Sequence, residues 1–251
     1  MILDEIISRT KTRVERLPES FRQDPKNEHA RLSHAIRSTT KKNAIIAEIK
    51  CASPTRGIIR RNADIPSLAL TFVSGGCIAL SILTEPYFFG GSPQDILRVR
   101  DLVEVPVLRK DFIIDRRQIS ETRALGADAV LLITAVLGER LPEFVDYAYD
   151  EGLEPLVEVH TRNDVVIARS TRADMIGINN RDLATLTIDR SATRALSPAI
   201  RSAGRIVISE SGIESATDIR EMRPFCDAFL IGTSIMADKE LGKKLEELIC
   251  A

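Results

Sequence analysis

The chain has 251 residues, of which 44% are hydrophobic and 28% are charged, and its formal net charge is -1. This length is sufficient to bury the core of one large domain or two small ones, and the near-neutral charge argues against a nucleic-acid-binding protein, which usually carries a basic surface. Four cysteines without a Cys-x-x-Cys pair, together with three histidines, argue against a zinc site and against a disulfide framework.

The N-terminal segment predicts helices. Apolar residues within 2–17 fall near helical spacing, and Pro18 ends that helix or turns the chain. A second short helix is expected around 32–36, after a polar stretch at 18–28. We interpret residues 1–42 as a helical extension that caps the core, and a partner-binding helix is the alternative.

The same N-terminal segment carries acidic residues early, unlike the basic start of a secretory signal. No apolar run approaches the roughly 20 residues that span a bilayer. We therefore expect a reduced, soluble, cytoplasmic protein that does not contact a membrane.

After residue 42 the chain predicts eight short β-segments separated by helical candidates. Intervals of roughly 20 to 30 residues separate the segments, and alternation of this kind indicates βα units around a parallel sheet. Eight units fit a closed (β/α)8 TIM barrel within a single domain of residues 1–251, and a doubly wound open sheet is the alternative. The predicted strands lie within residues 44–50, 77–83, 105–111, 127–133, 153–159, 174–180, 205–211 and 227–233. The clearest helical candidates are 115–126, 140–152 and 215–225.

Charged residues stand at the carboxyl ends of several predicted strands, which meet at one mouth of a barrel. Glu48 and Lys50 are two residues apart and share a face of their strand, while Lys110, Glu158 and Glu210 each share a face with an apolar residue two positions earlier. If these faces point inward, two lysines and three glutamates line one catalytic cup, and structural ion pairs or solvated strand ends are the alternative. Opposite charges and burial would shift their pKa values, as general acid–base catalysis requires.

The loops after the last two predicted strands indicate a phosphate site. Gly212 and Gly232 allow a backbone to approach a ligand closely, and Thr233 and Ser234 add hydroxyl groups. The long loop after the first strand predicts a mobile lid from which Ser53 reaches the phosphate, and an ordinary surface loop is the alternative. The aromatic residues at 87–89 are expected to form an apolar wall for a ring or a plug of the barrel top.

Taken together and in order, a series of motifs resembles the indole-3-glycerol phosphate synthase family of tryptophan biosynthesis: AEIKCASPTRG, LTEPYFFGGS, LRKDFIID, LVEVH, IGINNRDL, SESGI and FLIGTS. The resemblance covers nearly the whole chain and implies a (β/α)8 barrel that needs no metal and no organic cofactor. It implies a lyase, a decarboxylase that converts 1-(o-carboxyphenylamino)-1-deoxyribulose 5-phosphate to indole-3-glycerol phosphate, carbon dioxide and water. Thr55, where the family often has serine, and Arg116-Arg117, in place of a commoner Pro-Tyr, are small departures outside the charged cup.

The resemblance carries functional roles onto matching positions of this sequence. As catalytic residues it implies Lys110, Glu158, Lys50, Glu48, Asn179 and Glu210. As substrate-binding residues it implies Arg181, Ser53, Phe89, Ser211, Gly212, Leu230, Gly232 and Thr233.

The ring-closing chemistry suggests which proton transfer each charged residue carries out. Lys110 is expected to be the principal acid for ring closure, with Lys50 assisting or serving the dehydration step. Glu158 is expected to be the base of the last step, and Glu48 to orient Lys50. Arg181 is expected, with Asn179, to hold the substrate's carboxylate or hydroxyl groups. How the two lysines, and likewise Glu48 and Glu158, share the proton transfers stays open.

Two other functions remain as alternatives. A barrel enzyme resembling phosphoribosylanthranilate isomerase would need a cysteine or aspartate acid–base pair, and Cys51 is expected to face away from Lys50. A non-catalytic barrel would bind a phosphorylated ligand or a partner without turnover. We expect a small phosphorylated substrate and a monomer, and a dimer is left open.

Overall fold

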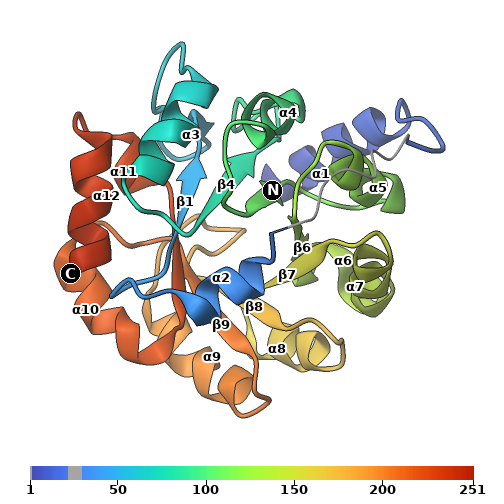
Figure 1. Ribbon diagram of the computed structural model, residues 1–251. Coiled ribbons are helices and arrows are strands. Elements are labelled where there is room, and N and C mark those ends of the chain that lie inside the picture. Colours follow the sequence, from blue (N-terminus) through green and yellow to red (C-terminus); the bar gives the residue numbers. More distant parts are fainter. Residues whose placement is uncertain (1, 22–29) are drawn as a thin grey trace.

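The computed structural model describes residues 2–21 and 30–251 and contains a closed barrel of eight parallel strands in the order β1-β10-β9-β8-β7-β6-β5-β4 (Figure 1). Each predicted β-segment contains one strand of this barrel, so the (β/α)8 prediction is confirmed and the doubly wound alternative is wrong. The strands are β1 (Ile45–Ile49), β4 (Ala79–Leu83), β5 (Val107–Lys110), β6 (Ala129–Ile133), β7 (Glu154–Val159), β8 (Met175–Asn179), β9 (Ile206–Glu210) and β10 (Ala228–Ile231).

Helices surround the barrel as an outer ring (Figure 1). Several begin at a residue whose side chain accepts a hydrogen bond from the first turn: Asp115, Thr161 and Ser215 each form a capping box. The helices of the ring and its connections are α3 (Ile65–Ser74), α4 (Gln94–Arg100), α5 (Arg116–Ala124), α6 (Thr134–Leu137), α7 (Leu141–Asp150), α8 (Arg162–Arg169), α9 (Ser191–Arg201), α10 (Ala216–Met222), α11 (Thr233–Met236) and α12 (Leu241–Cys250), with 3₁₀ turns η1 (Gly138–Arg140) and η2 (Arg223–Phe225). The three clearest helical predictions are confirmed by α5, α7 and α10. No helix in the described part of the chain is long and apolar enough to cross a membrane.

Side-chain alternation along each strand separates two buried layers. On β1, Ile45 and Ala47 pack outward against the helices, whereas Ile46 packs inside the barrel. β9 repeats the pattern, with Val207 outward and Ile208 inward. The barrel interior is thus apolar at its amino end, and the inward positions that follow at the carboxyl end carry the charged residues.

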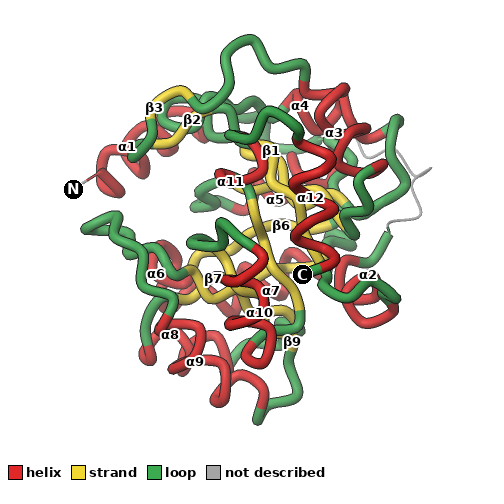
Figure 2. The backbone as a smooth tube through the Cα atoms, turned by 90° about the vertical axis from the view of Figure 1, so that its left-hand side faces the viewer, coloured by secondary structure: helices red, strands yellow, loops and turns green. Residues whose placement is uncertain are grey.

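The N-terminal helices pack on the barrel, as the cap interpretation predicts. Leu32 and Ile36 of α2 (Leu32–Ser38) are buried with inward residues of the strands, and α2 lies across the middle of the barrel (Figure 1). Ile6 of α1 (Ile2–Val14) is buried in the same cluster. α1 lies with β2 (Ala52–Ser53) and β3 (Gly57–Ile58) on one side of the molecule and α2 on the other (Figure 2). Of the predicted polar stretch between them, residues 22–28 lie outside the described residues.

The loop after β1 contains structure that the sequence analysis missed. β2 and β3 pair antiparallel as a small hairpin. The backbone N–H groups of Ile59 and Arg60 donate to the Cys51 carbonyl, and the Arg60 guanidinium donates to the carbonyls of Met236 and Asp238. These contacts attach the hairpin to the chain that follows α11, so the loop has a defined resting position at the barrel mouth.

Candidate active site

Lys110 lies at the centre of a charged cluster at the carboxyl end of the barrel. Its Nζ atom is 2.6 Å from Glu210 Oε2 and 3.4 Å from Glu158 Oε2. It is 3.9 Å from Glu48 Oε1, and the other Glu48 oxygen is 2.6 Å from Lys50 Nζ. The five charged residues therefore come from β1 and the residue after it, β5, β7 and β9, and meet in one cup, as the alternation argument predicts.

Burial and charge set the ionisation of this cup. Burial alone would lower the pKa of Lys110, but the facing carboxylates of Glu210, Glu158 and Glu48 raise it above its ordinary value. Burial would raise the pKa of Glu48, yet Lys50 and Lys110 hold it below its ordinary range. The pKa of Glu158 is likewise lowered, because Lys110 and His160 outweigh burial. These groups keep their charges at neutral pH.

Glu210 is the exception among the three glutamates. Its side chain is fully buried, and burial with repulsion from Glu158 and Glu48 raises its pKa to about 7, although Lys110 acts in the opposite direction. Its Oε1 atom has no hydrogen-bond partner among the described residues. Glu210 is therefore the carboxyl group of the cup that exchanges its proton near neutral pH.

Two glycines provide the space that the glutamates occupy. A Cβ atom at Gly177 on β8 would overlap with Glu210 Oε1, and a Cβ at Gly232 would overlap with Glu48 Oε2. Neither glycine has a positive φ, so the requirement is one of space and not of backbone conformation. The sequence analysis missed Gly177, whose signal is a glycine inside a buried strand.

Replacing Gly177 by alanine is expected to displace the Glu210 carboxylate from Lys110 and to lower kcat by on the order of 10²-fold, within the range for a mispositioned acid–base group. The measurement is steady-state turnover together with circular dichroism. Gly242→Ala is the matched control, because the new Cβ would meet nothing closer than Thr71 Cγ2 at 3.9 Å. A Gly177→Ala protein with wild-type kcat would contradict this account of the glycine.

All the predicted site residues line a single pocket at this mouth. From the charged cup and its strand ends these are Glu48, Lys50, Lys110, Glu158, Asn179, Arg181 and Glu210. From the surrounding loops and walls they are Ser53, Phe89, Ser211, Gly212, Leu230, Gly232 and Thr233. The pocket combines charge at its floor with apolar and hydroxyl groups along its sides.

The chain passes through two successive residues of positive φ at the end of β9. Ser211 and Gly212 adopt φ values of 65° and 84°, and the Ser211 carbonyl accepts a hydrogen bond from the side chain of Asn180. Turns can direct backbone N–H groups at an anion. Ser53 and Thr233 line the same pocket from the β1 loop and from the start of α11.

Arg181 lies on the loop after β8. Its guanidinium donates to the Leu186 carbonyl, and its backbone N–H donates to Asn179 Oδ1. Burial, with repulsion from Arg56, lowers its pKa from the ordinary value. These contacts hold the cation at the pocket wall.

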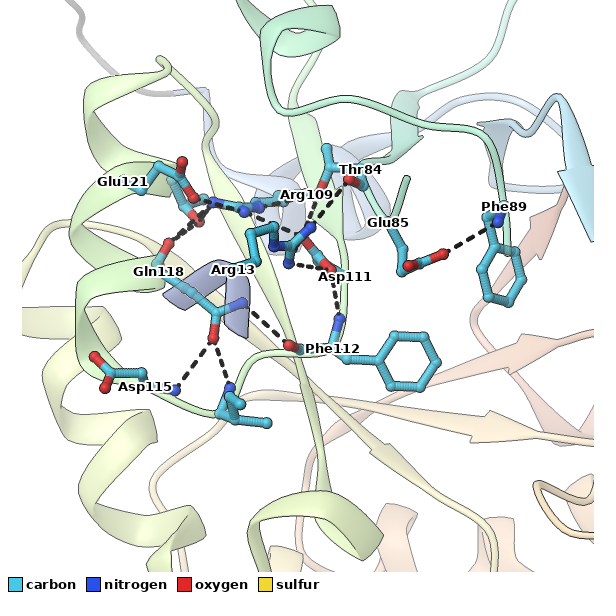
Figure 3. Close-up of polar contacts among 12 residues, drawn as sticks. Arg13, Thr84, Glu85, Phe89, Arg109, Asp111, Phe112, Asp115, Gln118 and Glu121 are labelled. Atoms are coloured by element: carbon cyan, nitrogen blue, oxygen red, sulfur yellow. Dashed lines mark hydrogen bonds and ion pairs between the residues drawn. The ribbon is translucent and has the colours of Figure 1, made fainter. Parts of the chain in front are cut away.

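The aromatic residues after β4 divide between two environments. Glu85 accepts hydrogen bonds from the backbone N–H groups of Tyr87, Phe88 and Phe89, which fixes the turn. Phe89 lines the pocket with its ring 6.2 Å from that of Phe112 (Figure 3). Of these three residues Phe89 alone lines the pocket. Phe88 packs with it against the inner apolar cluster, whereas Tyr87 is exposed, and the rings of Tyr87 and Phe88 face the Arg9 guanidinium.

The sequence analysis also missed apolar wall residues contributed from distant segments. Ile2, Leu3 and Ile6 of α1 line the pocket together with Phe112 and Leu131. The helical spacing of α1 signals an apolar face but gives no information about where that face packs.

Arg109 and Asp111, which flank Lys110, belong to a different buried network (Figure 3). Arg109 is fully buried and pairs with Asp111 at 3.0 Å and with Glu121 at 2.7 Å. Asp111 also accepts hydrogen bonds from the guanidinium of Arg13 in α1, at 2.7 Å, and from the Thr84 hydroxyl. Lys110 alone of this charged triplet belongs to the cup, and its neighbours join β5 to α5 and α1.

Cys51 packs against the outer apolar layer, as expected from its register next to Lys50. Burial raises the pKa of its thiol. Among the described residues no group of three or more histidine, cysteine, aspartate or glutamate side chains has a metal-binding arrangement.

Comparison with known proteins identifies one family of enzymes that this chain is similar to. The family model described as indole-3-glycerol phosphate synthase matches residues 3–248. The chain is 41% identical to the indole-3-glycerol phosphate synthase of Methanocaldococcus jannaschii, over 99% of this chain and 98% of that protein. It is 40% identical to the same enzyme of Aquifex aeolicus, over 98% of each.

Solved structures share the fold at much lower identity. A tryptophan synthase from M. tuberculosis superposes with a TM-score of 0.66 at 11% identity, over 89% of this chain and 98% of that one. A thiamine phosphate pyrophosphorylase from Pyrococcus furiosus superposes with a TM-score of 0.61 at 15% identity, over 82% and 93%. At these identities the likeness concerns the barrel fold alone.

Proposed function

The chain belongs to the indole-3-glycerol phosphate synthase family, the carboxy-lyases that form the indole ring in tryptophan biosynthesis, and we propose that its charged cup performs the proton transfers of that reaction. The reaction converts 1-(o-carboxyphenylamino)-1-deoxyribulose 5-phosphate to indole-3-glycerol phosphate, carbon dioxide and water. The observation that supports the assignment of residues is the Lys110 ammonium, which faces three carboxylates from three other strands.

Ring closure requires an acid at the ketone of the substrate. As the aromatic carbon attacks, the ketone oxygen gains negative charge, and the Lys110 ammonium transfers a proton to it. Carbon dioxide then leaves and returns its electron pair to the ring system. Glu210, whose Oε2 atom is 2.6 Å from Lys110 Nζ, reprotonates the lysine after it has given its proton away.

Dehydration requires an acid and a base. The departing hydroxyl takes a proton from Lys50, which Glu48 orients at 2.6 Å, while the ionised Glu158 takes the ring proton. Loss of water and of this proton completes the indole. Glu158 then passes its proton to Lys110, whose Nζ atom is 3.4 Å from Glu158 Oε2, as Lys110 returns one to Glu210 at 2.6 Å, and Lys50 takes one proton from solvent. All four residues thereby regain their starting charges.

The rest of the pocket is suited to the other groups of the substrate. The turn at Ser211 and Gly212, with Ser53, Gly232 and Thr233, would hold the phosphate. Arg181 and Asn179 would hold the carboxylate, and the guanidinium plane suits a planar anion. Phe89 and Leu230 would enclose the aromatic ring.

The raised pKa of Glu210 predicts a pH dependence. As the pH rises through about 7, Glu210 in the free enzyme loses the proton that recharges Lys110, so kcat/KM is expected to fall. Glu210→Gln is expected to be slower and to lack this alkaline limb. The substrate's own phosphate ionises equally for both proteins, so its effect cancels in the ratio of the wild-type to the Glu210→Gln profile of kcat/KM against pH. A ratio that does not fall as the pH rises through about 7 would contradict the assignment.

A single assay tests the function itself. Incubation with the carboxyphenylamino substrate should produce indole fluorescence and one carbon dioxide per turnover. Binding without turnover would favour the non-catalytic alternative, and failure to bind, with turnover of phosphoribosylanthranilate instead, would favour the isomerase. The monomeric state and the cytoplasmic location stay predictions.

A further inference from the structure

A histidine that the proposed mechanism does not use lies behind the Glu158 carboxylate. His160 follows β7 directly, and its Nε2 atom is 3.4 Å from Glu158 Oε1. The other oxygen, Oε2, is 3.4 Å from Lys110 Nζ. The carboxylate therefore has one oxygen toward the ammonium in the cup and one toward the imidazole. Glu158 lines the pocket, whereas His160 is outside the set of pocket-lining residues.

The imidazole is nearly buried and has few other polar contacts. Its side chain is 9% exposed, and neither ring nitrogen has a hydrogen-bond partner within the described ranges. The backbone N–H of His160 donates to Asp164 Oδ2 at the start of α8, which fixes the chain at this point. Buried ring nitrogens without a partner are unfavourable. Glu158 Oε1 is the acceptor that the ring faces.

Other charges surround the pair. From the cup, Lys110 attracts Glu158, and Glu48 and Glu210 lie beside the same ammonium. From the loop after β8, Asp182 is near enough to His160 for their charges to interact. Lys110 is shared among three carboxylates, and the Asn179 side chain also hydrogen-bonds to Glu158. A donor at Oε1 would fix the orientation of the Glu158 carboxylate together with these two groups.

We propose that His160 is a positioning residue for Glu158: its Nε2–H group holds Oε1, so that Oε2 stays turned toward Lys110 and the pocket. The inference rests on the proposed function, in which Glu158 takes the ring proton. It assigns to the LVEVH motif a second functional side chain, two residues after the base and on the same side of the strand. The lowered pKa of Glu158, to which His160 contributes after Lys110, agrees with this arrangement.

Two substitutions separate positioning from simple packing. His160→Phe keeps a planar ring without a donor and is expected to lower kcat by about 10- to 100-fold, the loss typical of one hydrogen bond to a charged group, with KM changed by less than about threefold. The acid limb of its kcat profile should move to higher pH, because the pKa of Glu158 rises. His160→Gln keeps a donor near the Nε2 position and should recover most of kcat. His160→Leu is the second apolar variant, in case the phenylalanine variant fails to fold.

A double-variant cycle completes the test. His160→Phe should cost nothing further in a Glu158→Gln background, because the histidine acts through that carboxylate. Wild-type kcat in His160→Phe or His160→Leu would overturn the inference, as would a glutamine variant no better than these. If Glu158→Gln itself turned over at the wild-type rate, the proposed role of Glu158 would fail and the role of His160 with it. If Glu158→Gln has low activity but His160→Phe is unaffected, the proposed role of His160 would fail and that of Glu158 would stand.

Discussion

Replacement of Lys110 by methionine is expected to lower turnover of the carboxyphenylamino substrate by on the order of 10²–10⁴-fold. The side chain keeps its apolar stem but loses the ammonium that protonates the ketone oxygen. The lysine is also the common partner of Glu210, Glu158 and Glu48, so its loss removes the charge that keeps Glu158 ionised as a base. Acid and base functions should therefore fail together, and indole fluorescence in single-turnover experiments measures the loss.

The control for this variant is Lys243→Met. Lys243 is largely exposed, pairs with Glu240 on the surface and is not among the pocket-lining residues, so its loss should leave turnover unchanged. Far-UV circular dichroism and thermal unfolding establish that the Lys110→Met barrel is folded. A folded Lys110→Met protein with near wild-type turnover would end the assignment of Lys110 as the acid.

The inward positions of the charged cup follow from the sequence because a β-strand alternates with period two. Once β1 is placed, Ile46, Glu48 and Lys50 must lie on one side, and the apolar start of the series identifies that side as the interior. The same reasoning places Glu158 and Glu210. The alternation of side chains along single strands was therefore sufficient to predict which charged residues line the cup.

Contacts between distant segments could not be obtained in this way. Arg13 pairs with Asp111 across 98 positions of sequence, and the spacing of α1 indicates that it has an apolar face without indicating which surface receives it. The pKa of Glu210 likewise depends on how closely Glu158 and Glu48 approach the same lysine. The hairpin of β2 and β3 has two-residue strands, which are too short to show a period.

Arg109→Met is expected to lower the free energy of unfolding by about 3–5 kcal/mol, the loss typical of removing one partner from a buried ion pair. The Arg109 guanidinium has no exposed surface, pairs with Asp111 and Glu121, and also donates to Thr84 Oγ1. Methionine fills the volume but leaves two carboxylates without this partner. Urea titration should show a lower midpoint with an unchanged slope. Arg98→Met, at an exposed pair with Asp95, should change stability by less than about 1 kcal/mol.

Acid should reduce the difference between wild type and Arg109→Met, and this dependence distinguishes lost charge pairing from lost packing. The pKa of Asp111 is lowered because Arg109 and Arg13 outweigh burial, so its contribution to stability is present at neutral pH and is lost as the pH falls through and below roughly 4, the ordinary range of an aspartate. In Arg109→Met that contribution is smaller from the start, since Arg13 alone remains as the cation beside Asp111. The two stability curves should therefore converge on acidification. A difference that is the same at pH 7 and at low pH would mean that methionine disturbs packing, and that the charges around Asp111 contribute little.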